Sequence, residues 1–409
     1  MPPPPPLTGS DQRSVLRCGT TADLLAALPF LTGFTAENSL FIVMFEGSRS
    51  GHVARMDLPR DQEDPGMGLL IDAVCELLRA TGAGAEAPAL VIVSDDAFAS
   101  SGGAPWRGLA RQLRGRFRRE GWRLRDLAVM ARDGWASLMG EARPRVGRPL
   151  DEIRASPIAA AAAAAIGPTD APRPLSELGR IGPADASRAA AVVDRLAELD
   201  RRESPDREEA GGSGAEETAR ASRADASVWL HGTARVAEAC FRSEDVPDSR
   251  LCARFVRAAE DPRRWLLLAL TAVTRARFVM DAVQEAEDLV PGRFSEVPID
   301  LDAGPTPGPA RGWSIRRILC SLAAQRAGAE KIRRTIEVVG SIAAHTPEAR
   351  RPGLLALLAW AWWLRGTQTV ASGLLDDALR LTPGHELSLM MQRLIATPPA
   401  WTRRPVGDG

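Results

Sequence analysis

Two short stretches in which almost every residue is apolar constrain the fold of this chain most strongly. They are Ser39–Phe45 (SLFIVMF) and Ala89–Val93 (ALVIV), and turn-forming residues follow each of them. A strand with one face in water alternates apolar and polar side chains, whereas a strand covered on both faces is apolar throughout. We therefore expect two central strands of a sheet that is buried on both sides.

The residues before the first strand predict an amphipathic helix. Thr20 or Thr21 is suited to cap its N-terminus, because a hydroxyl oxygen can accept from an unpaired backbone N–H. Pro29 is expected to end or kink the helix, and Gly33 follows as a C-terminal stop. The apolar face of this helix carries four leucines, at positions 24, 25, 28 and 31.

The periodicity keeps changing as far as about residue 139, which is typical of mixed α and β structure. Residues 52–58 alternate and are expected to form a hairpin with the strand before them. Helices are predicted at about 65–80 and 105–120, and a further strand at about 124–131. Together these elements predict a sheet of four or five strands with three helices.

The composition along the chain predicts an α+β (mixed) protein, in which an N-terminal α/β sheet domain is followed by an all-α helical domain. Residues 1–14 contain five consecutive prolines and predict a disordered tail, and the α/β domain is expected over 15–141. Residues 142–223 are expected to be a linker with short helices. Within it, 200–223 offers almost nothing to bury and is expected to be disordered. The all-α domain is expected over 224–400.

Composition also excludes several classes of protein. The chain has 52 basic and 52 acidic residues, and this zero net charge disfavours nucleic acid as a partner. Its five cysteines contain no C-x-x-C pair and its four histidines are isolated from one another, so no metal site is expected. No apolar run reaches the ~18–20 residues of a spanning helix, so we expect no membrane partner and a cytoplasmic location.

Charged residues where the strands are predicted to end are the candidates for a catalytic site. Arg55 and Asp57 lie two residues apart on a strand and so share a face, and Asp95 and Asp96 directly follow another strand. Ligands of α/β sheets bind beyond the carboxyl ends of parallel strands, although two aspartates after a strand are equally well explained by turn formation. Ser39 and Asn38 are candidate ligand-binding residues at the same place.

A helical hairpin over 352–385 has the residue pattern of a single tetratricopeptide-like unit. Large, small and aromatic residues occupy the positions where that 34-residue repeat requires them, and Gly366 lies at the turn. The pattern is absent one repeat earlier, and a single unit equally fits an ordinary hairpin that closes the domain core. Trp360 and Trp363 lie on its first helix. Because one tryptophan should face away from the hairpin, these two are candidates for contact with a neighbouring helix or a protein partner.

The densest basic run extends from residue 111 to residue 125. Leu109, Leu113 and Phe117 recur at every fourth position and define the inward side of a helix, and arginines occupy the rest of its circumference. A solvated amphipathic helix explains the run, and a nucleic-acid-binding face is the weaker alternative.

Several segments resemble the actinobacterial family catalogued as domain of unknown function 4192. They are TADLLAALPFLTGF at 21–34, ENSL at 37–40 and RMDLP at 55–59, with a further likeness at 355–387. Family members often carry a cysteine cluster that this chain lacks between Trp135 and the GRPL segment at 147–150, so no metal or redox role is expected from it. The resemblance implies a fold and a lineage, and the family's name implies no activity.

No phosphate-binding loop, dinucleotide fingerprint or nucleophile elbow is present in the sequence. We therefore expect a non-catalytic binding or regulatory protein with a protein partner at the C-terminal helical domain. The alternative is an enzyme that uses Asp57, Asp95 and Asp96 on a small molecule or nucleotide. The sequence indicates no particular cofactor.

Overall fold

The computed structural model divides the described residues into two units, one ending at Leu178 and one beginning at Gly179. The described residues are 18–47, 49–60, 66–82, 86–140, 145–165, 171–203, 231–242, 246–274, 277–289, 299–301, 313–323 and 328–396. The predicted tail at 1–14 lies outside these ranges, as does most of the predicted disordered segment at 200–223.

The N-terminal unit is built on a five-stranded sheet with the order β3-β2-β4-β5-β6. Its strands are β2 (Ser39–Glu46), β3 (Arg49–Asp57), β4 (Ala89–Val93), β5 (Asp126–Ala131) and β6 (Gly134–Ser137). β2 is antiparallel to both β3 and β4, β4 is parallel to β5, and β6 returns antiparallel to β5. The predicted hairpin and central strands are therefore present, and β6 is a strand that the sequence did not indicate.

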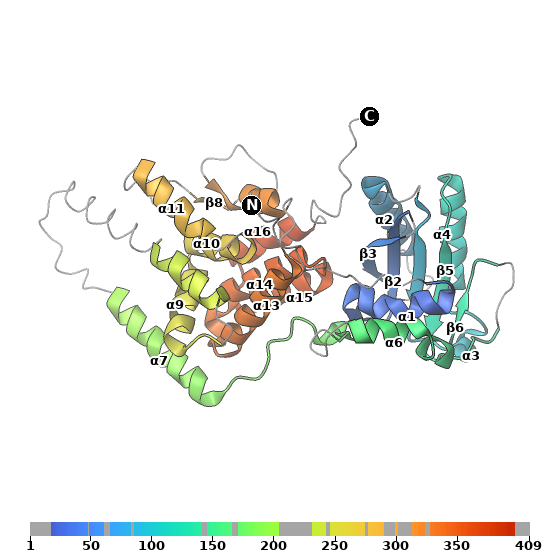
Figure 1. Ribbon diagram of the computed structural model, residues 1–409, viewed down its shortest axis with the longest axis horizontal. Helices are drawn as coiled ribbons and strands as arrows, with labels where there is room; N and C mark the ends of the chain where they lie inside the picture. Colours follow the sequence, from blue (N-terminus) through green and yellow to red (C-terminus); the bar gives the residue numbers. More distant parts are fainter. Residues whose placement is uncertain are drawn as a thin grey trace, which may run out of the picture. The chain divides into compact units, whose positions relative to one another are not determined.

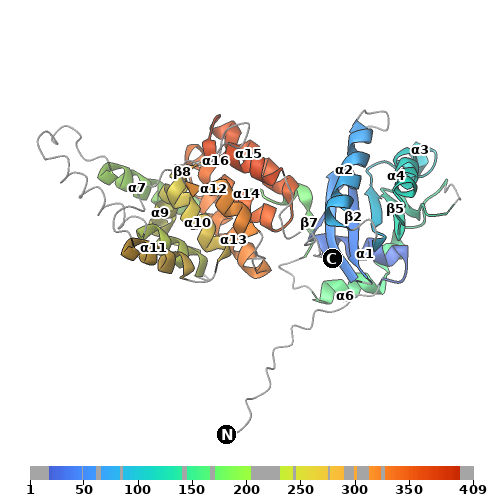
Figure 2. The same ribbon diagram turned by 90° about the horizontal axis from the view of Figure 1, so that it is seen from above.

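Helices cover both faces of this sheet (Figures 1 and 2). On one face, Leu40, Ile42 and Val129 pack against α2 (Gly66–Thr81) and α4 (Arg107–Arg119). On the other face, Phe41 and Val91 pack against the leucines of α1 (Thr21–Thr32). Because successive strand residues point to opposite faces, a strand between two helical layers must be apolar throughout, which explains the two apolar runs. The predicted α+β class is confirmed.

Helix α1 has the predicted caps, Thr20 at its N-terminus and Gly33 after its C-terminus, but it does not end at Pro29. The Thr20 hydroxyl accepts from the backbone N–H of Asp23 at 3.1 Å, and the Asp23 side chain accepts in return from the Thr20 N–H. The helix continues through Pro29 to Thr32, so Pro29 does not end it. Gly33 follows in the left-handed conformation (φ 78°), and its N–H donates to the Pro29 carbonyl at 2.8 Å.

Residues 142–223, predicted as a linker with short helices, contribute elements to both units. Helices α5 (Asp151–Arg154) and α6 (Pro157–Ala165) pack against α1, and β7 (Arg173–Pro174) pairs with β1 (Phe34–Thr35). Helix α7 (Ala186–Glu203) instead packs against α9 of the C-terminal unit. The sequence suggested a linker because these helices are short or largely polar, and they gain their stability from one packed side.

Helices dominate the C-terminal unit, as predicted. Its named helices in the described ranges are α7, α9 (Ser249–Glu260), α10 (Pro262–Val273), α11 (Phe278–Leu289), α12 (Ile315–Ala323), α13 (Ala329–Ala344), α14 (Pro352–Leu364), α15 (Gln368–Leu381) and α16 (Glu386–Ile395). Every residue of α14 is buried, and α9, α10, α13, α15 and α16 all contact it. A helix that is apolar all round belongs at the centre of a helical unit.

Helices α14 and α15 form the predicted hairpin, with Gly366 (φ 91°) in the turn between them. The likeness of this hairpin to a tetratricopeptide unit stays a prediction. In the parts of the chain that the structure describes, no helix is both long and apolar enough to cross a membrane.

Candidate functional site

The candidate residues at the strand ends all lie at one end of the sheet. Ser39, the first residue of β2, pairs with Asp57 at the end of β3 and with Val93 at the end of β4. The parallel pairing of β4 with β5 brings the end of β5 to the same end of the sheet. Strand pairing thus brings together, at one end of the sheet, residues that are far apart in sequence.

Arg55, Ser39 and Asp57 form one group at this end. The Arg55 Nε donates to the Ser39 hydroxyl at 2.9 Å, and its guanidinium also forms an ion pair with Asp57. Arg55 and Asp57 share a face, as expected, yet only 9% of the Arg55 side chain is exposed against 71% of that of Asp57. Ser39 is fully buried and its hydroxyl donates to the Glu37 carbonyl at 2.6 Å. This group fixes the N-terminus of β2 against the end of β3.

Asn38 and Asp95 form a second group beside the first. The Asn38 amide donates to the Asp95 carboxylate at 2.6 Å, and the Asp95 backbone N–H donates to the Asn38 side-chain carbonyl at 3.1 Å. Asn38 has a left-handed backbone (φ 42°), which asparagine tolerates better than most residues. The two bonds join the loop before β2 to the loop after β4.

Two further carboxylates hold the segment after β4. The Ser94 hydroxyl donates to Asp96 at 3.4 Å and accepts from the buried Trp106 indole at 3.2 Å. Asp133, between β5 and β6, accepts from the backbone N–H groups of Phe98 and Ala99 at 2.7 and 3.2 Å. The Phe98 N–H is the main reason why the pKa of Asp133 is lowered. Asp133 was missed because nothing in its sequence context indicates this contact.

Each strand-end carboxylate therefore has a partner side chain nearby, and the three carboxylates do not bind one another. Asp57 pairs with Arg55, Asp95 with Asn38 and Asp96 with Ser94. Within the described ranges, no three residues of the types that bind metals are grouped closely enough to hold an ion. The arrangement connects loops at the end of the sheet and has the geometry of a structural network.

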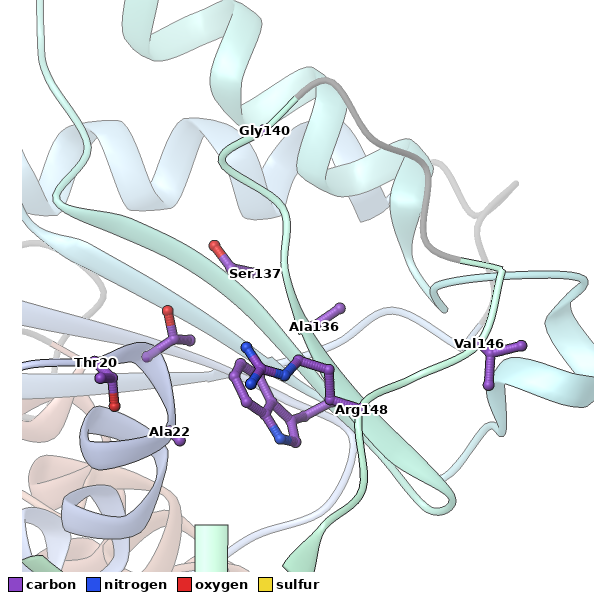
Figure 3. Close-up of a pocket in the computed structure, with 9 residues that line it drawn as sticks. Thr20, Ala22, Ala136, Ser137, Gly140, Val146 and Arg148 are labelled. Atoms are coloured by element: carbon purple, nitrogen blue, oxygen red, sulfur yellow. The ribbon is translucent and has the colours of Figure 1, made fainter. Parts of the chain in front are cut away.

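A pocket of about 460 Å³ lies elsewhere in the N-terminal unit, between the first turn of α1 and strand β6 (Figure 3). Figure 3 shows Thr20 and Ala22 on the α1 side, Ser137 on β6, and the Arg148 side chain extending toward α1. The full lining consists of Thr20, Thr21, Ala22, Trp135, Ala136, Ser137, Gly140, Val146 and Arg148.

One buried aromatic residue, Trp135, is among the residues that line this pocket. Trp135 is 2% exposed and belongs to the core beneath α1. The Arg148 guanidinium carbon lies 4.6 Å from the centre of its ring, within cation–π range. Two backbone hydrogen bonds, of 3.0 and 2.8 Å, join Trp135 to Arg148. Close contact between Gly134 and Gly147, where an added Cβ would lie 2.8 Å from the other residue's Cα, allows these two segments to meet.

The Asp126 carboxylate holds two hydroxyl groups of the pocket lining by hydrogen bonds. It accepts from the Thr21 hydroxyl at 2.6 Å and from the Ser137 hydroxyl at 3.0 Å. Arg148 donates to Glu152 at 2.8 Å through one nitrogen. The hydroxyl oxygens of Thr21 and Ser137 keep lone pairs that can accept from a ligand, and Arg148 has further N–H groups that can donate.

The pocket was missed by the sequence reasoning, although Trp135 and the GRPL segment at 147–150 had been noted as flanks of a family motif. What brings these two flanks together is a β-bridge between Trp135 and Arg148. The Thr21–Asp126 contact spans 105 residues of sequence, so no local pattern signals it.

The predicted partner-binding residues of the C-terminal unit are in its core. Trp360 is 0% exposed and Trp363 is 2% exposed, and their rings stack with centroids 5.4 Å apart. The sequence left two contacts open for the outward tryptophan, a neighbouring helix or a protein partner, and a partner contact would require an open side of α14. Helices cover α14 all round, so these side chains contact neighbouring helices instead.

Comparison with known proteins gives one match. None of the curated proteins and none of the solved structures matches the chain. A family model described as "Domain of unknown function (DUF4192)" matches residues 22–289. The match extends well beyond the N-terminal segments that carry the resemblance and stops before 355–387, where the resemblance stays a prediction. Because the model matches more than half of the chain, this protein belongs to the DUF4192 family.

Proposed function

We propose that this chain is a non-catalytic binding protein whose N-terminal unit holds a small molecule in the pocket between α1 and β6. The observation that carries the proposal is the pocket itself, in which Arg148 lies over the Trp135 ring and Thr20, Thr21 and Ser137 contribute hydroxyl groups to the lining. Its volume of about 460 Å³ is within the usual range for small-molecule sites.

The pocket's chemistry favours binding over catalysis. A serine nucleophile needs an adjacent general base, which in turn is oriented by a third group. The partner of Ser137 is the Asp126 carboxylate, which also accepts from Thr21, and neither histidine nor lysine is among the lining residues. The donors and acceptors present suit a ligand with both kinds of group.

The alternative enzyme, with Asp57, Asp95 and Asp96 as its catalytic carboxylates, has less support. Each of these carboxylates already has a partner in a neighbouring loop or strand. A protein partner for the C-terminal unit stays a prediction, and its contact surface would be formed by residues other than Trp360 and Trp363.

A thermal-shift screen of the full chain against metabolites and nucleotides tests the proposal. We expect a ligand whose stabilisation is lost in both Arg148→Ala and Ser137→Ala. The matched control is Arg154→Ala, which removes an exposed arginine that, like Arg148, has a nearby carboxylate partner on α5.

Three results would contradict the proposal. They are silence across the screen, a shift that survives both pocket substitutions, and turnover of the bound ligand. Turnover lost in Asp57→Asn or Asp95→Asn would instead establish the enzyme.

A further inference from the structure

Helix α4 carries six arginines and no acidic residue, and four of those arginines form a row. At 3.6 residues per turn, Arg107, Arg111, Arg114 and Arg118 lie within about 60° of one another around the helix axis. They extend along roughly 16 Å of it, since each residue rises about 1.5 Å. Four of the six arginines on α4 therefore lie on one side of the helix, rather than being spread around its whole exposed circumference.

Two arginines off the row, Arg116 and Arg125, have partners, whereas the exposed Arg119 has none among the described residues. Arg116 lies on another side of the helix and pairs with Asp72 of α2 and with Glu120, at 3.3 and 3.2 Å. Arg125, just beyond the helix, donates to the Gly47 carbonyl at 2.9 Å and stacks over Phe45. These contacts are structural and explain those two residues.

Within the row, one arginine has polar partners and three have none among the described residues. Arg114 donates to the carbonyls of Leu138 and Gly140. The side chains of Arg107, Arg111 and Arg118 are exposed and have no carboxylate or other polar partner among the described residues. A chain with equal numbers of acidic and basic residues has thus placed three unpaired cations in line.

Helix stability accounts for only part of this row. Arg118 lies in the last turn, where a cation interacts favourably with the helix dipole. Arg107 is the first residue of the helix, where the same dipole disfavours a cation. Arg107 therefore lowers the helix's own stability slightly, which is expected of a residue kept for an external contact.

The surroundings of the row decide which anionic partner fits. The apolar residues of α4, including Leu109, Leu113 and Phe117, are buried in the core. The helix has no apolar side left to enter a membrane, and no exposed aromatic or aliphatic residue to form the centre of a protein interface. A nucleic-acid backbone requires only regularly spaced cations with N–H donors, and guanidinium groups bind phosphate in two-pronged fashion.

We propose that the α4 arginine row binds the phosphate backbone of nucleic acid without reading its sequence. Arg107, Arg111 and Arg118 supply the phosphate contacts, and Arg114 is fixed to the β6–Gly140 segment beside them. The three arginines that supply the phosphate contacts are not among the lining residues of the pocket, so their failure or success leaves the proposed small-molecule site unchanged.

The test is fluorescence anisotropy of the full chain with a labelled mixed-sequence duplex DNA over a series of salt concentrations. For three phosphate contacts we expect a slope of log K against log salt of about −2.7, or roughly a 40-fold loss of affinity between 50 and 200 mM salt. The triple variant Arg107→Gln, Arg111→Gln, Arg118→Gln should remove most of this binding and most of the slope.

A charge-matched control separates the row from net charge. The triple variant Arg195→Gln, Arg202→Gln, Arg380→Gln removes the same charge from exposed, ion-paired positions of the C-terminal unit and should bind DNA like the wild type. Circular dichroism confirms that both variants fold. Equal binding by the two triple variants would overturn the proposal, as would no binding by the wild type. It would also be overturned by tighter binding to a polyglutamate peptide, or to vesicles of phosphatidylcholine with phosphatidylserine, than to DNA.

Discussion

The two units of this chain are held together in different ways. In the N-terminal unit, polar side chains join the loops at the sheet ends, as in the Asn38–Asp95 and Thr21–Asp126 contacts. In the C-terminal unit, the central helix α14 is enclosed by other helices, and its backbone comes close to that of α9 at Gly353. Polar side chains join the loops at the strand ends of the sheet, whereas close packing of apolar helices forms the core of the C-terminal unit. We therefore expect the two units to respond differently to substitution.

The largest effect is expected for Gly353→Ala. A Cβ at this position would lie 2.0 Å from the Ala259 carbonyl oxygen, and neither backbone can move without shifting a whole helix. We expect a loss of about 3 kcal/mol or more in unfolding free energy, at or above the upper end for overpacking. Urea denaturation followed by circular dichroism measures it.

Gly340→Ala is the matched control for that substitution. Gly340 lies within α13, and nothing is within 4 Å of the added Cβ. It should stabilise the unit by roughly 0.5–1 kcal/mol, the gain from replacing glycine by alanine in a helix. If the two variants behaved alike, the close approach of α9 and α14 would not be a determinant of stability.

The substitution Arg350→Ala tests whether ion pairs also contribute to the stability of the C-terminal unit. Arg350 pairs with Glu260 at 2.5 Å and with Asp200 of α7 at 2.9 Å, and these pairs raise its pKa. The group is partly buried, so we expect a loss of about 1–2 kcal/mol, between the values for exposed and buried ion pairs. Arg195→Ala, which breaks an exposed pair on α7, should change stability by less than about 0.5 kcal/mol. Equal effects of the two would show that the Arg350 network adds nothing.

The substitution Asp23→Ala tests the contribution of side-chain hydrogen bonds to the stability of the N-terminal unit. Asp23 completes the capping box of α1 and accepts from the Ser156 hydroxyl at 2.7 Å, which joins α1 to the start of α6. We expect a loss of about 1 kcal/mol, typical of a lost helix cap. Asp151→Ala, at an exposed carboxylate, is the control.

The same residue gives a pH dependence. The Ser156 hydroxyl, with the Thr20 hydroxyl and nearby backbone N–H groups, lowers the pKa of Asp23 below 3.8. The unfolded chain therefore takes up this proton first, so the contribution of Asp23 is complete above pH 3.8 and is lost as the pH falls below it. Acid titration of unfolding free energy should be less steep in Asp23→Ala than in the wild type. Identical titration curves would contradict this assignment.

The smallest effect is expected at His385, which precedes α16. Its Nδ1 accepts from the Ser388 backbone N–H at 3.3 Å, and burial lowers its pKa below 6.5. The folded state thus favours the neutral ring, so stability is complete above pH 6.5 and declines as the pH falls below it. His385→Gln should remove this decline between pH 7.5 and 5.5 in thermal melts. A decline that persists in the variant would assign it to another group.

The sequence by itself determined the elements and the family of this protein. The apolar runs at 39–45 and 89–93 were sufficient to predict central strands, because only a strand between two layers is apolar on both faces. Thr20 and Gly33 were sufficient to mark the two ends of α1, because capping is a property of a few consecutive residues. The motifs at 21–34 and 55–59 were sufficient to indicate the DUF4192 family.

Only the tertiary structure decided which side chains meet. The strand order and the turns after β4 and β5 pair Asp95 with Asn38 and Asp133 with Phe98, so the candidate carboxylates have structural partners. The enclosure of α14 buries both Trp360 and Trp363, a result that depends on five other helices. The pocket at Arg148 likewise depends on packing, whereas the arginine row on α4 follows from residue spacing along a helix. The direction in which a helix faces is set by what covers its apolar side, and local sequence does not specify that neighbour.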